Sequence, residues 1–352
     1  MAIQKISIEE FLSLAKKHPL FDVRSPGEFL HAHIPGAHSL PLFSDEERKN
    51  VGTAYKQQNR ETAIKIGLDF FGTKMRSIIE AVEKIISSVS DPSKIILIHC
   101  WRGGMRSAGV AWLLDLYGFK VFTLTGGYKS YRKHVFLQFQ KEYRFTIIGG
   151  YTGSGKTLLL QELKANAKVV IDLEGLANHK GSALGGLGKD SQPTQEMFEN
   201  LLAKELEENH TCDIFLEDES QRIGDLQLPM PLWSTIRKSP VYFFEIPFEE
   251  RLNYLTEEYS VQPKESLVYA IMRIQKRLGG LETKNAINFL LENNYRESFR
   301  ILLCYYDKYY LKGLHNRENK DELIKTIKTD KIITAKNTEK ILSLCKYATA
   351  AQ

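Results

Sequence analysis

Residues 150–157 read GYTGSGKT and match the pattern Gly-x-x-x-x-Gly-Lys-Ser/Thr in full. The segment lies between a β-branched run at 145–148 and a helical pattern that starts at Lys156, which is the placement that this phosphate-binding loop requires. Backbone N–H groups of the loop and the helix N-terminus attract phosphate oxygens, and the lysine adds a positive charge. The sequence therefore predicts an α/β domain that binds a phosphorylated ligand through Gly150, Gly153, Ser154, Gly155, Lys156 and Thr157.

The motif leaves the identity of the phosphorylated ligand open. Thr157 would ligate Mg²⁺ if a metal accompanies the phosphates. Glu217 and Asp218 close a strand pattern where P-loop NTPases place a metal-organising acid, although a solvated strand end has the same composition. Residues 245–252, EIPFEERL, resemble the strand-Pro-helix passage of small P-loop kinases. A small-molecule kinase therefore stays open as an alternative function.

A second loop carries a candidate nucleophile. Residues 98–107 read IHCWRGGMRS, with Cys100 ending a strand pattern and Arg106 at the start of a helix. Loop N–H groups and a helix N-terminus lower the pKa of a thiol, and an arginine would hold an oxyanion or a persulfide-like group opposite it. A buried, inert cysteine is the alternative. The predicted catalytic residues are Cys100 and Arg106, in a loop completed by Trp101, Arg102, Gly103, Gly104 and Met105.

Two enzyme families share such a loop, the rhodanese sulfurtransferases and the cysteine-dependent phosphatases with their His-Cys-x5-Arg pattern. Upstream, residues 21–42, FDVRSPGEFLHAHIPGAHSLPL, resemble the rhodanese signature. Phosphatases of the rhodanese fold have loops of the same length, so a cysteine phosphatase fused to an NTPase is a second alternative. The four cysteines of the chain form no Cys-x-x-Cys pair, which argues against a zinc site and a disulfide framework.

Strand and helix patterns alternate along most of the chain. Strands are predicted at 20–23, 95–99 and 121–124, then at 145–148, 169–172, 214–218 and 241–246, and beyond Pro247 the pattern is helical with no convincing strand. We therefore predict an α/β protein with an N-terminal rhodanese-like parallel-sheet domain and a second P-loop α/β domain with a helical C-terminal extension. The predicted boundaries are 1–138 for the first domain, 139–247 for the second and 248–352 for the extension.

Composition narrows the class of protein further. A hydrophobic fraction of 43% and a charged fraction of 26% are typical of soluble globular proteins, and they exclude the disordered, fibrous and membrane classes. Glu9 and Glu10 interrupt the segment where a signal peptide would need its apolar stretch. We therefore expect a cytoplasmic protein with no membrane partner. A net charge of +5 is mild and does not by itself indicate a nucleic-acid partner.

The order of the two loops resembles that of the bacterial tRNA 2-selenouridine synthase family, in which a rhodanese domain is followed directly by a P-loop domain. Further stretches similar to that family lie at residues 51–67, 172–186, 216–224 and 273–280. The resemblance covers nearly the whole chain, and neither loop departs from it.

The resemblance implies that selenium replaces sulfur at C2 of a wobble 2-thiouridine in tRNA. A thiocarbonyl sulfur is a poor leaving group, so geranyl diphosphate would first alkylate it. Selenophosphate would then deliver selenium with loss of geranyl thiol. The P-loop would hold the diphosphate, and Cys100 would accept or pass selenium, held by loop N–H groups and Arg106. The implied partners are tRNA, geranyl diphosphate and selenophosphate, the last delivered by its synthase, with Mg²⁺ on the diphosphate and no tightly bound cofactor.

Polar residues that follow the predicted strands are candidate substrate contacts, because P-loop proteins bind ligands at that edge of the sheet. A loop capped by its own polar groups is the alternative. The candidates are Asp172, Glu174, His179, Lys180, Ser182, Glu217, Asp218 and Arg222.

Binding a folded RNA requires basic residues, and two segments offer them. Arg273, Lys276 and Arg277 recur at helical spacing beside a Gly-Gly turn, although a solvated helix face has the same pattern. The segment from residue 301 onward contains ten basic and six acidic residues. It also contains tyrosines at 305, 306, 309 and 310, which would either stack on bases or pack in a core. We expect the tRNA contacts at Arg273, Lys276 and Arg277. A non-catalytic RNA-binding protein is the last alternative.

Overall fold

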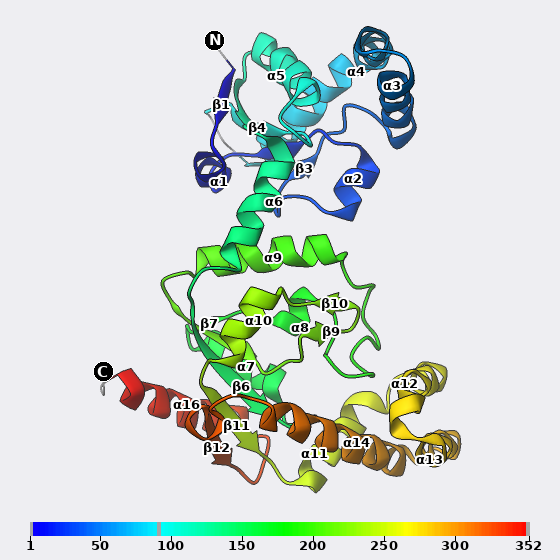
Figure 1. Cartoon of the computed structure of the whole chain (residues 1–352), viewed down its shortest axis with the longest axis vertical. Helices are drawn as coiled ribbons and strands as arrows, with labels where there is room; N and C mark the ends of the chain where they lie inside the picture. The colour runs from blue at the N-terminus through cyan, green and yellow to red at the C-terminus, as the bar shows by residue number, and fades with distance from the viewer. Residues whose placement is uncertain (1–2, 90–92, 350–352) are drawn as a thin grey trace. The chain divides into compact units, whose positions relative to one another are not determined.

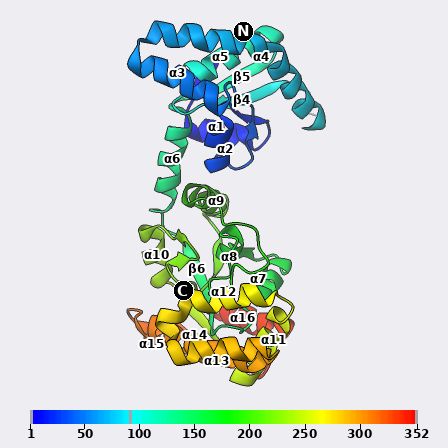
Figure 2. The same ribbon diagram turned by 90° about the vertical axis from the view of Figure 1, so that its right-hand side faces the viewer.

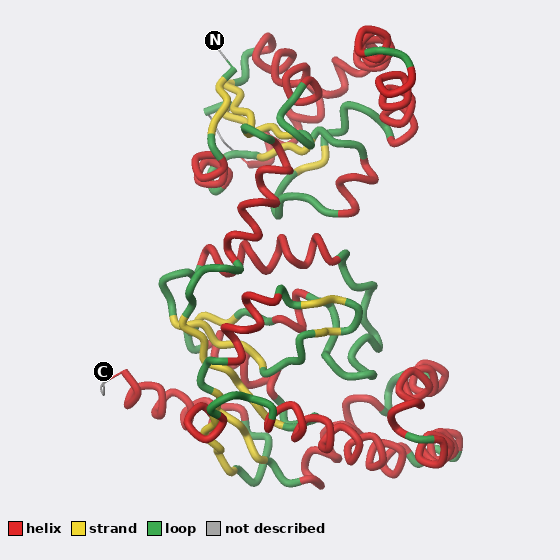
Figure 3. Tube along the Cα trace, viewed as in Figure 1, coloured by secondary structure: helices red, strands yellow, loops and turns green. Residues whose placement is uncertain are grey.

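The structure is a computed structural model that describes residues 3–89 and 93–349, and the chain divides into two compact units between residues 138 and 139. Each unit is an α/β fold around one five-stranded sheet (Figures 1 and 3). Among the described residues, no helix is both long and apolar enough to cross a membrane.

The first unit is built on a parallel sheet with the strand order β1-β5-β4-β2-β3. Its central strand, the apolar run IILIH, is buried over its last four residues, as expected for a strand covered on both faces. The strands are β1 (Gln4–Ile6), β2 (Leu20–Asp22), β3 (His38–Ser39), β4 (Ile95–His99) and β5 (Lys120–Leu124).

Local sequence signals set the ends of several helices in this unit. Ser44 and Glu47 form a capping box at the start of α3, and Gly118, with φ of +107°, ends α5 in the left-handed conformation. Helices α4 and α5 pack against the sheet through a core of Ile, Leu, Val and Phe. The helices are α1 (Ile8–Ala15), α2 (Pro26–His31), α3 (Asp45–Gln57), α4 (Arg60–Val89), α5 (Met105–Tyr117) and α6 (Gly127–Gln138).

The second unit has a parallel sheet with the order β12-β11-β6-β8-β7, and an antiparallel hairpin of β9 and β10. The prediction that no strand follows residue 247 is wrong. β12 pairs with β11 along its full length, but its sequence IKTIK is mostly polar and only Ile327 is buried, as expected at the edge of a sheet. The strands are β6 (Arg144–Gly150), β7 (Val169–Val170), β8 (Asp213–Glu217), β9 (Arg222–Ile223), β10 (Leu226–Gln227), β11 (Val241–Glu245) and β12 (Ile324–Lys328).

Beyond β11 the chain is mainly helical, as predicted. Helices α12, α13 and α14 lie side by side (Figure 2), and they share an apolar core with α11. The helices of the second unit are α7 (Lys156–Ala165), α8 (Leu173–Leu176), α9 (Gln195–Glu208), α10 (Met230–Arg237), α11 (Phe248–Tyr259), α12 (Lys264–Leu278), α13 (Gly280–Leu291), α14 (Tyr295–His315), α15 (Lys320–Leu323) and α16 (Thr334–Thr349).

Candidate functional site

Cys100 follows the last residue of β4, and the loop 100–104 leads into α5. The thiol is buried, with the residue 3% exposed, and its Sγ is hydrogen-bonded to Ser107 Oγ at 3.2 Å. Burial raises the pKa of the Cys100 thiol, but hydrogen bonds from Ser107 and from the N–H groups of Arg102 and Gly104 outweigh it. The net pKa is therefore lowered, which is the condition for a reactive thiolate.

The turn at Gly126 and Gly127 holds the Cys100 loop through backbone hydrogen bonds, and no motif in the sequence analysis included it. Tyr128 N–H donates to Cys100 O at 2.8 Å, and Lys129 N–H donates to Trp101 O at 3.0 Å. Gly103 and Gly127 have φ of +63° and +60°, and a Cβ on either would collide with the backbone of the other segment. The pair Gly126-Gly127 directly after a predicted strand was the signal that could have identified this turn.

Arg106 is held at the mouth of the loop by a carboxylate. Its Nη1 donates to Glu28 Oε2 at 2.8 Å, and Arg48 Nε contacts the same oxygen at 2.8 Å. Trp101, Arg102 and Met105 are exposed beside it. Arg106 and Arg48 are thus both paired with the single carboxylate of Glu28.

The predicted P-loop connects β6 to α7 through two glycines in the left-handed region. Gly153 and Gly155 have φ of +77° and +73°, and Gly155 is the N-cap of α7. Lys156 Nζ donates to Gly150 O at 2.9 Å, so the lysine folds back over its own loop. Gly153, Ser154, Gly155, Lys156 and Thr157 all line one cavity of about 980 Å³.

Carboxylates gather on one side of the P-loop. Thr157 Oγ1 donates to Glu174 Oε2 at 3.3 Å, and Glu174 N–H donates to Glu217 Oε1 at 2.6 Å. Burial, followed by the charges of Asp172 and Glu174, raises the pKa of Glu217 to about 8, which favours the protonated carboxyl. Asp172, Glu174 and Glu219 line the cavity, whereas Glu217 lies behind them.

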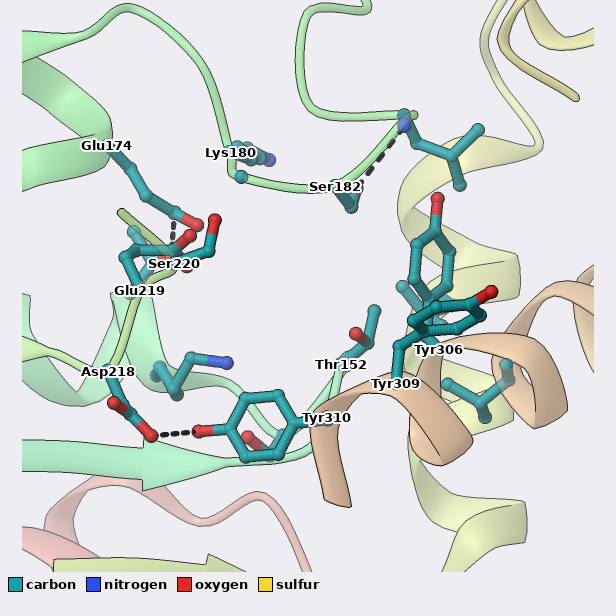
Figure 4. A pocket seen from close by; sticks show the side chains of 18 of the residues that line it. Thr152, Glu174, Lys180, Ser182, Asp218, Glu219, Ser220, Tyr306, Tyr309 and Tyr310 are labelled. Atoms are coloured by element: carbon teal, nitrogen blue, oxygen red, sulfur yellow. Dashed lines mark hydrogen bonds between the residues drawn. The ribbon is translucent and has the colours of Figure 1, made fainter. Parts of the chain in front are cut away.

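Asp218 is held by two partners that lie far away in the sequence. Tyr310 donates its hydroxyl proton to Asp218 Oδ2 at 2.8 Å (Figure 4). The buried Arg317 donates to Asp218 Oδ1 at 2.6 Å. Gly150 N–H donates to the same Tyr310 oxygen at 3.3 Å. No sequence motif points to Arg317, and the sequence indicates base stacking or core packing for Tyr310. No local signal pairs either residue with Asp218.

The far wall of the cavity is apolar and aromatic. Tyr306 and Tyr309 of α14 line this wall (Figure 4), and Tyr306 accepts a hydrogen bond from Ala183 N–H at 2.9 Å. Leu255 and Phe299 belong both to this wall and to the core of the helical extension. The wall meets the P-loop at Gly153, where an added Cβ would lie 2.9 Å from Leu255.

Of the remaining candidate substrate contacts, Lys180 and Ser182 line the cavity, whereas His179 and Arg222 do not. Lys180 pairs with Glu258, and Ser182 Oγ accepts from Leu184 N–H at 3.2 Å; both residues line the cavity. His179 is buried, and burial followed by the charges of Arg273 and Lys189 lowers the pKa of its imidazole. Arg222 is exposed on β9 and bonds to Gly224 O and Asp225, outside the residues that line the cavity.

The proposed RNA contacts are exposed on α12. Arg277 reaches the rim of the P-loop cavity, whereas Lys276 borders a smaller cavity of about 430 Å³ at the turn between α12 and α13. Arg273 lies in neither lining, and its charge acts on His179 and Tyr306. The structure therefore brings one of the three residues to the phosphate-binding site.

Two protein families match this chain. A rhodanese-like domain matches residues 7–134, and the tRNA 2-selenouridine synthase AAA domain matches residues 143–341. These matches confirm the predicted fold class. A solved structure of the N-terminal domain of a Clostridium difficile 630 protein aligns with 38% of this chain and 98% of that chain, at 38% identity and a TM-score of 0.34.

Curated relatives match over most of the chain. The tRNA 2-selenouridine synthase of Hydrogenovibrio crunogenus is 36% identical over 84% of this chain and 89% of its own length. That of Sulfurovum sp. is 35% identical over 82% of this chain and 85% of its own length. That of Nitrosomonas europaea is 37% identical over 68% of this chain and 63% of its own length.

Proposed function

The chain belongs to the tRNA 2-selenouridine synthase family, and on that premise we propose that it replaces sulfur by selenium at C2 of wobble 2-thiouridine in tRNA. In the first step a geranyl group passes from geranyl diphosphate to the sulfur, and diphosphate leaves. In the second step the selenium of selenophosphate bonds to C2 and expels the geranyl thiol, and water then cleaves the Se–P bond so that phosphate leaves. The reaction takes place in the cytoplasm, with selenophosphate delivered by its synthase.

The observation that carries the first step is the composition of the P-loop cavity. One end offers loop N–H groups, the start of α7 and Lys156, which suit a diphosphate. The wall beyond Gly153 is built of Leu255, Phe299 and tyrosines, which suit a hydrocarbon chain. A volume of about 980 Å³ is at the upper end for small-molecule sites, enough for a prenyl diphosphate together with a base.

The same geometry weakens the case for a kinase. In P-loop NTPases an acid at the end of a neighbouring strand organises the metal. Here both oxygens of Asp218 already accept hydrogen bonds, one from Tyr310 and one from Arg317. Mg²⁺ prefers oxygen ligands, and Thr157 and Glu174 offer an adjacent hydroxyl and carboxylate that would hold it beside the diphosphate, where it would neutralise charge.

Selenium handling is assigned to Cys100. The lowered pKa of its thiol and the inward N–H groups of Arg102 and Gly104 suit a nucleophile that accepts or passes selenium. Arg106, held at the mouth by Glu28, is placed to meet an anionic group that enters the loop. The tRNA itself is assigned to Arg273, Lys276 and Arg277 on the exposed face of α12.

Mass spectrometry of tRNA nucleosides tests the proposal. Thiolated tRNA is incubated with the full chain and geranyl diphosphate, then with selenophosphate, and digested to nucleosides. S-geranyl-2-thiouridine after the first incubation and 2-selenouridine after the second are expected. Selenouridine that forms equally fast without geranyl diphosphate would remove the alkylation step, and no product in either incubation would refute the function.

A further inference from the structure

The ring of Tyr310 is fixed beside the P-loop by hydrogen bonds at its hydroxyl. The oxygen accepts from Gly150 N–H at 3.3 Å and donates its proton to Asp218 at 2.8 Å, and Asp218 is anchored in turn by Arg317. The ring also packs at 5.8 Å and 5.9 Å between centroids against Tyr151 and Phe243. A side chain with this many constraints keeps one orientation, so its ring is preorganised relative to the bound phosphates.

Aromatic rings in this cavity already interact with cations. Lys156 Nζ lies 5.6 Å from the centroid of the Tyr310 ring, and Lys180 Nζ lies 5.7 Å from that of Tyr259. The face of an aromatic ring is negative and attracts positive charge. Hydrogen bonding of the Tyr310 hydroxyl to a carboxylate pushes electron density into the ring, which strengthens that attraction.

We propose that Tyr310 is a catalytic residue of the alkylation step and that its ring stabilises positive charge on the allylic carbon of the prenyl donor. This inference rests on the proposed function. As the bond between C1 and the diphosphate oxygen breaks, both electrons go to that oxygen, and the remaining charge is shared between C1 and C3. A lone pair of the thiocarbonyl sulfur then forms the carbon–sulfur bond, and the N3–H proton of the base passes to solvent.

Lys156 and Tyr310 stabilise opposite charges: the lysine stabilises the negative leaving group, and the ring stabilises the positive allylic carbon. The lysine lies within reach of both the loop and the ring, so an anion in the P-loop draws it toward the leaving group. The ring then faces the carbon that becomes positive as the leaving group becomes negative. Asp218 and Arg317 are positioning residues, because they act through Tyr310. An acid at a strand end beside the P-loop thereby orients a ring, a different task from organising a metal.

Single-turnover alkylation of thiolated tRNA by the full chain tests the proposal, with geranyl diphosphate and 2-fluorogeranyl diphosphate as donors. Fluorine withdraws electrons from the allylic carbon, so the wild-type rate should fall by more than about tenfold with the fluorinated donor. Tyr310→Leu should lower the rate with geranyl diphosphate by about 30-fold, while Tyr310→Phe, which keeps a ring, should lose less than about fivefold. Tyr55→Leu, at an exposed tyrosine of α3, is the matched control and should leave the rate unchanged.

Donor binding, measured by displacement of a fluorescent prenyl diphosphate, should be alike in the wild type and both Tyr310 variants. Equal wild-type rates with the two donors would mean that no cation develops and would overturn the inference while the proposed function stands. Equal losses in Tyr310→Phe and Tyr310→Leu would assign the effect to the hydroxyl and also overturn it. A wild type that alkylates tRNA with neither donor would refute the proposed function itself, and the inference with it.

Discussion

Cys100 Sγ and Ser107 Oγ are joined by a hydrogen bond of 3.2 Å across the first turn of α5. A thiolate can only accept, so the serine hydroxyl donates to it and stabilises the charged form. The same hydroxyl can instead donate to Gly104 O at 3.1 Å, so its single proton serves either the carbonyl oxygen or the thiolate. The first turn of the helix therefore contributes a side-chain donor in addition to backbone N–H groups.

Replacing Ser107 by Ala should raise the pKa of the Cys100 thiol, because a donor that favours the thiolate is lost. The pKa is lowered in the wild type, so near neutral pH the variant should carry less thiolate and react more slowly, and the difference should vanish at high pH. Ultraviolet titration of thiolate absorbance, taken as the difference from Cys100→Ser, measures this directly. An unchanged or lowered pKa of the Cys100 thiol in this variant would show that Ser107 does not stabilise the thiolate.

Gly127→Ala should disrupt the Cys100 loop, because the residue has φ of +60° and an added Cβ would meet the backbone of Cys100 and Gly103. We expect a loss of about 2 kcal/mol or more in the free energy of unfolding, together with loss of sulfur transfer from thiosulfate. Gly72→Ala is the matched control, since Gly72 is a helical residue of α4 with no atom within 4 Å of an added Cβ. Equal stability of the two variants in thermal unfolding would contradict the role of this turn.

Cys100→Ser should block selenium incorporation and leave tRNA binding nearly intact, because a hydroxyl is far less acidic than a thiol and cannot replace it as nucleophile. Nucleoside mass spectrometry and filter binding measure the two properties separately. Cys304→Ser, at an exposed cysteine on α14, should behave as wild type. Selenouridine formed at the wild-type rate by Cys100→Ser would take the role away from Cys100.

Lys156→Ala should abolish alkylation of the tRNA, since the lysine is the charged group of the P-loop within reach of a diphosphate. The wild type should hydrolyse ATP only at background rates, because both oxygens of Asp218 are engaged. Lys164→Ala, on the exposed face of the same helix, is the control. Rapid, tRNA-stimulated ATP hydrolysis by the wild type would revive the NTPase alternative, and normal binding of geranyl diphosphate to Lys156→Ala would move the diphosphate elsewhere.

Replacing Arg273, Lys276 and Arg277 together by Ala should weaken tRNA binding by more than about tenfold at moderate salt. The slope of log affinity against log salt should flatten by about two units, because each phosphate contact contributes roughly 0.7 to 0.9 units to that slope. Thiosulfate chemistry at Cys100 should persist. A triple variant at Lys308, Lys312 and Lys336, three exposed lysines of the tail, serves as the control. If the control loses affinity and the α12 variant does not, the tail is the RNA-binding surface.

The sequence by itself determined both loops, because each is a local structure. In GYTGSGKT and HCWRGGMRS the residues that contact one another lie within about eight positions, so glycines at fixed offsets and the strand-turn-helix context already define the backbone path. The central strands were predictable for a similar reason, since a strand buried on both faces is a continuous apolar run.

Only the tertiary structure decided which distant residues complete the phosphate-binding site. Tyr310 and Arg317 reach Asp218 across 92 and 99 positions, a pairing that depends on how α14 packs against the sheet. The strand β12 was not predicted because IKTIK is short and mostly polar, and it forms a strand only by pairing with β11. Arg222 is only four positions from Asp218 in sequence, yet it lies in a surface hairpin instead. Such contacts depend on how whole helices and strands pack, and short-range sequence patterns do not encode that packing.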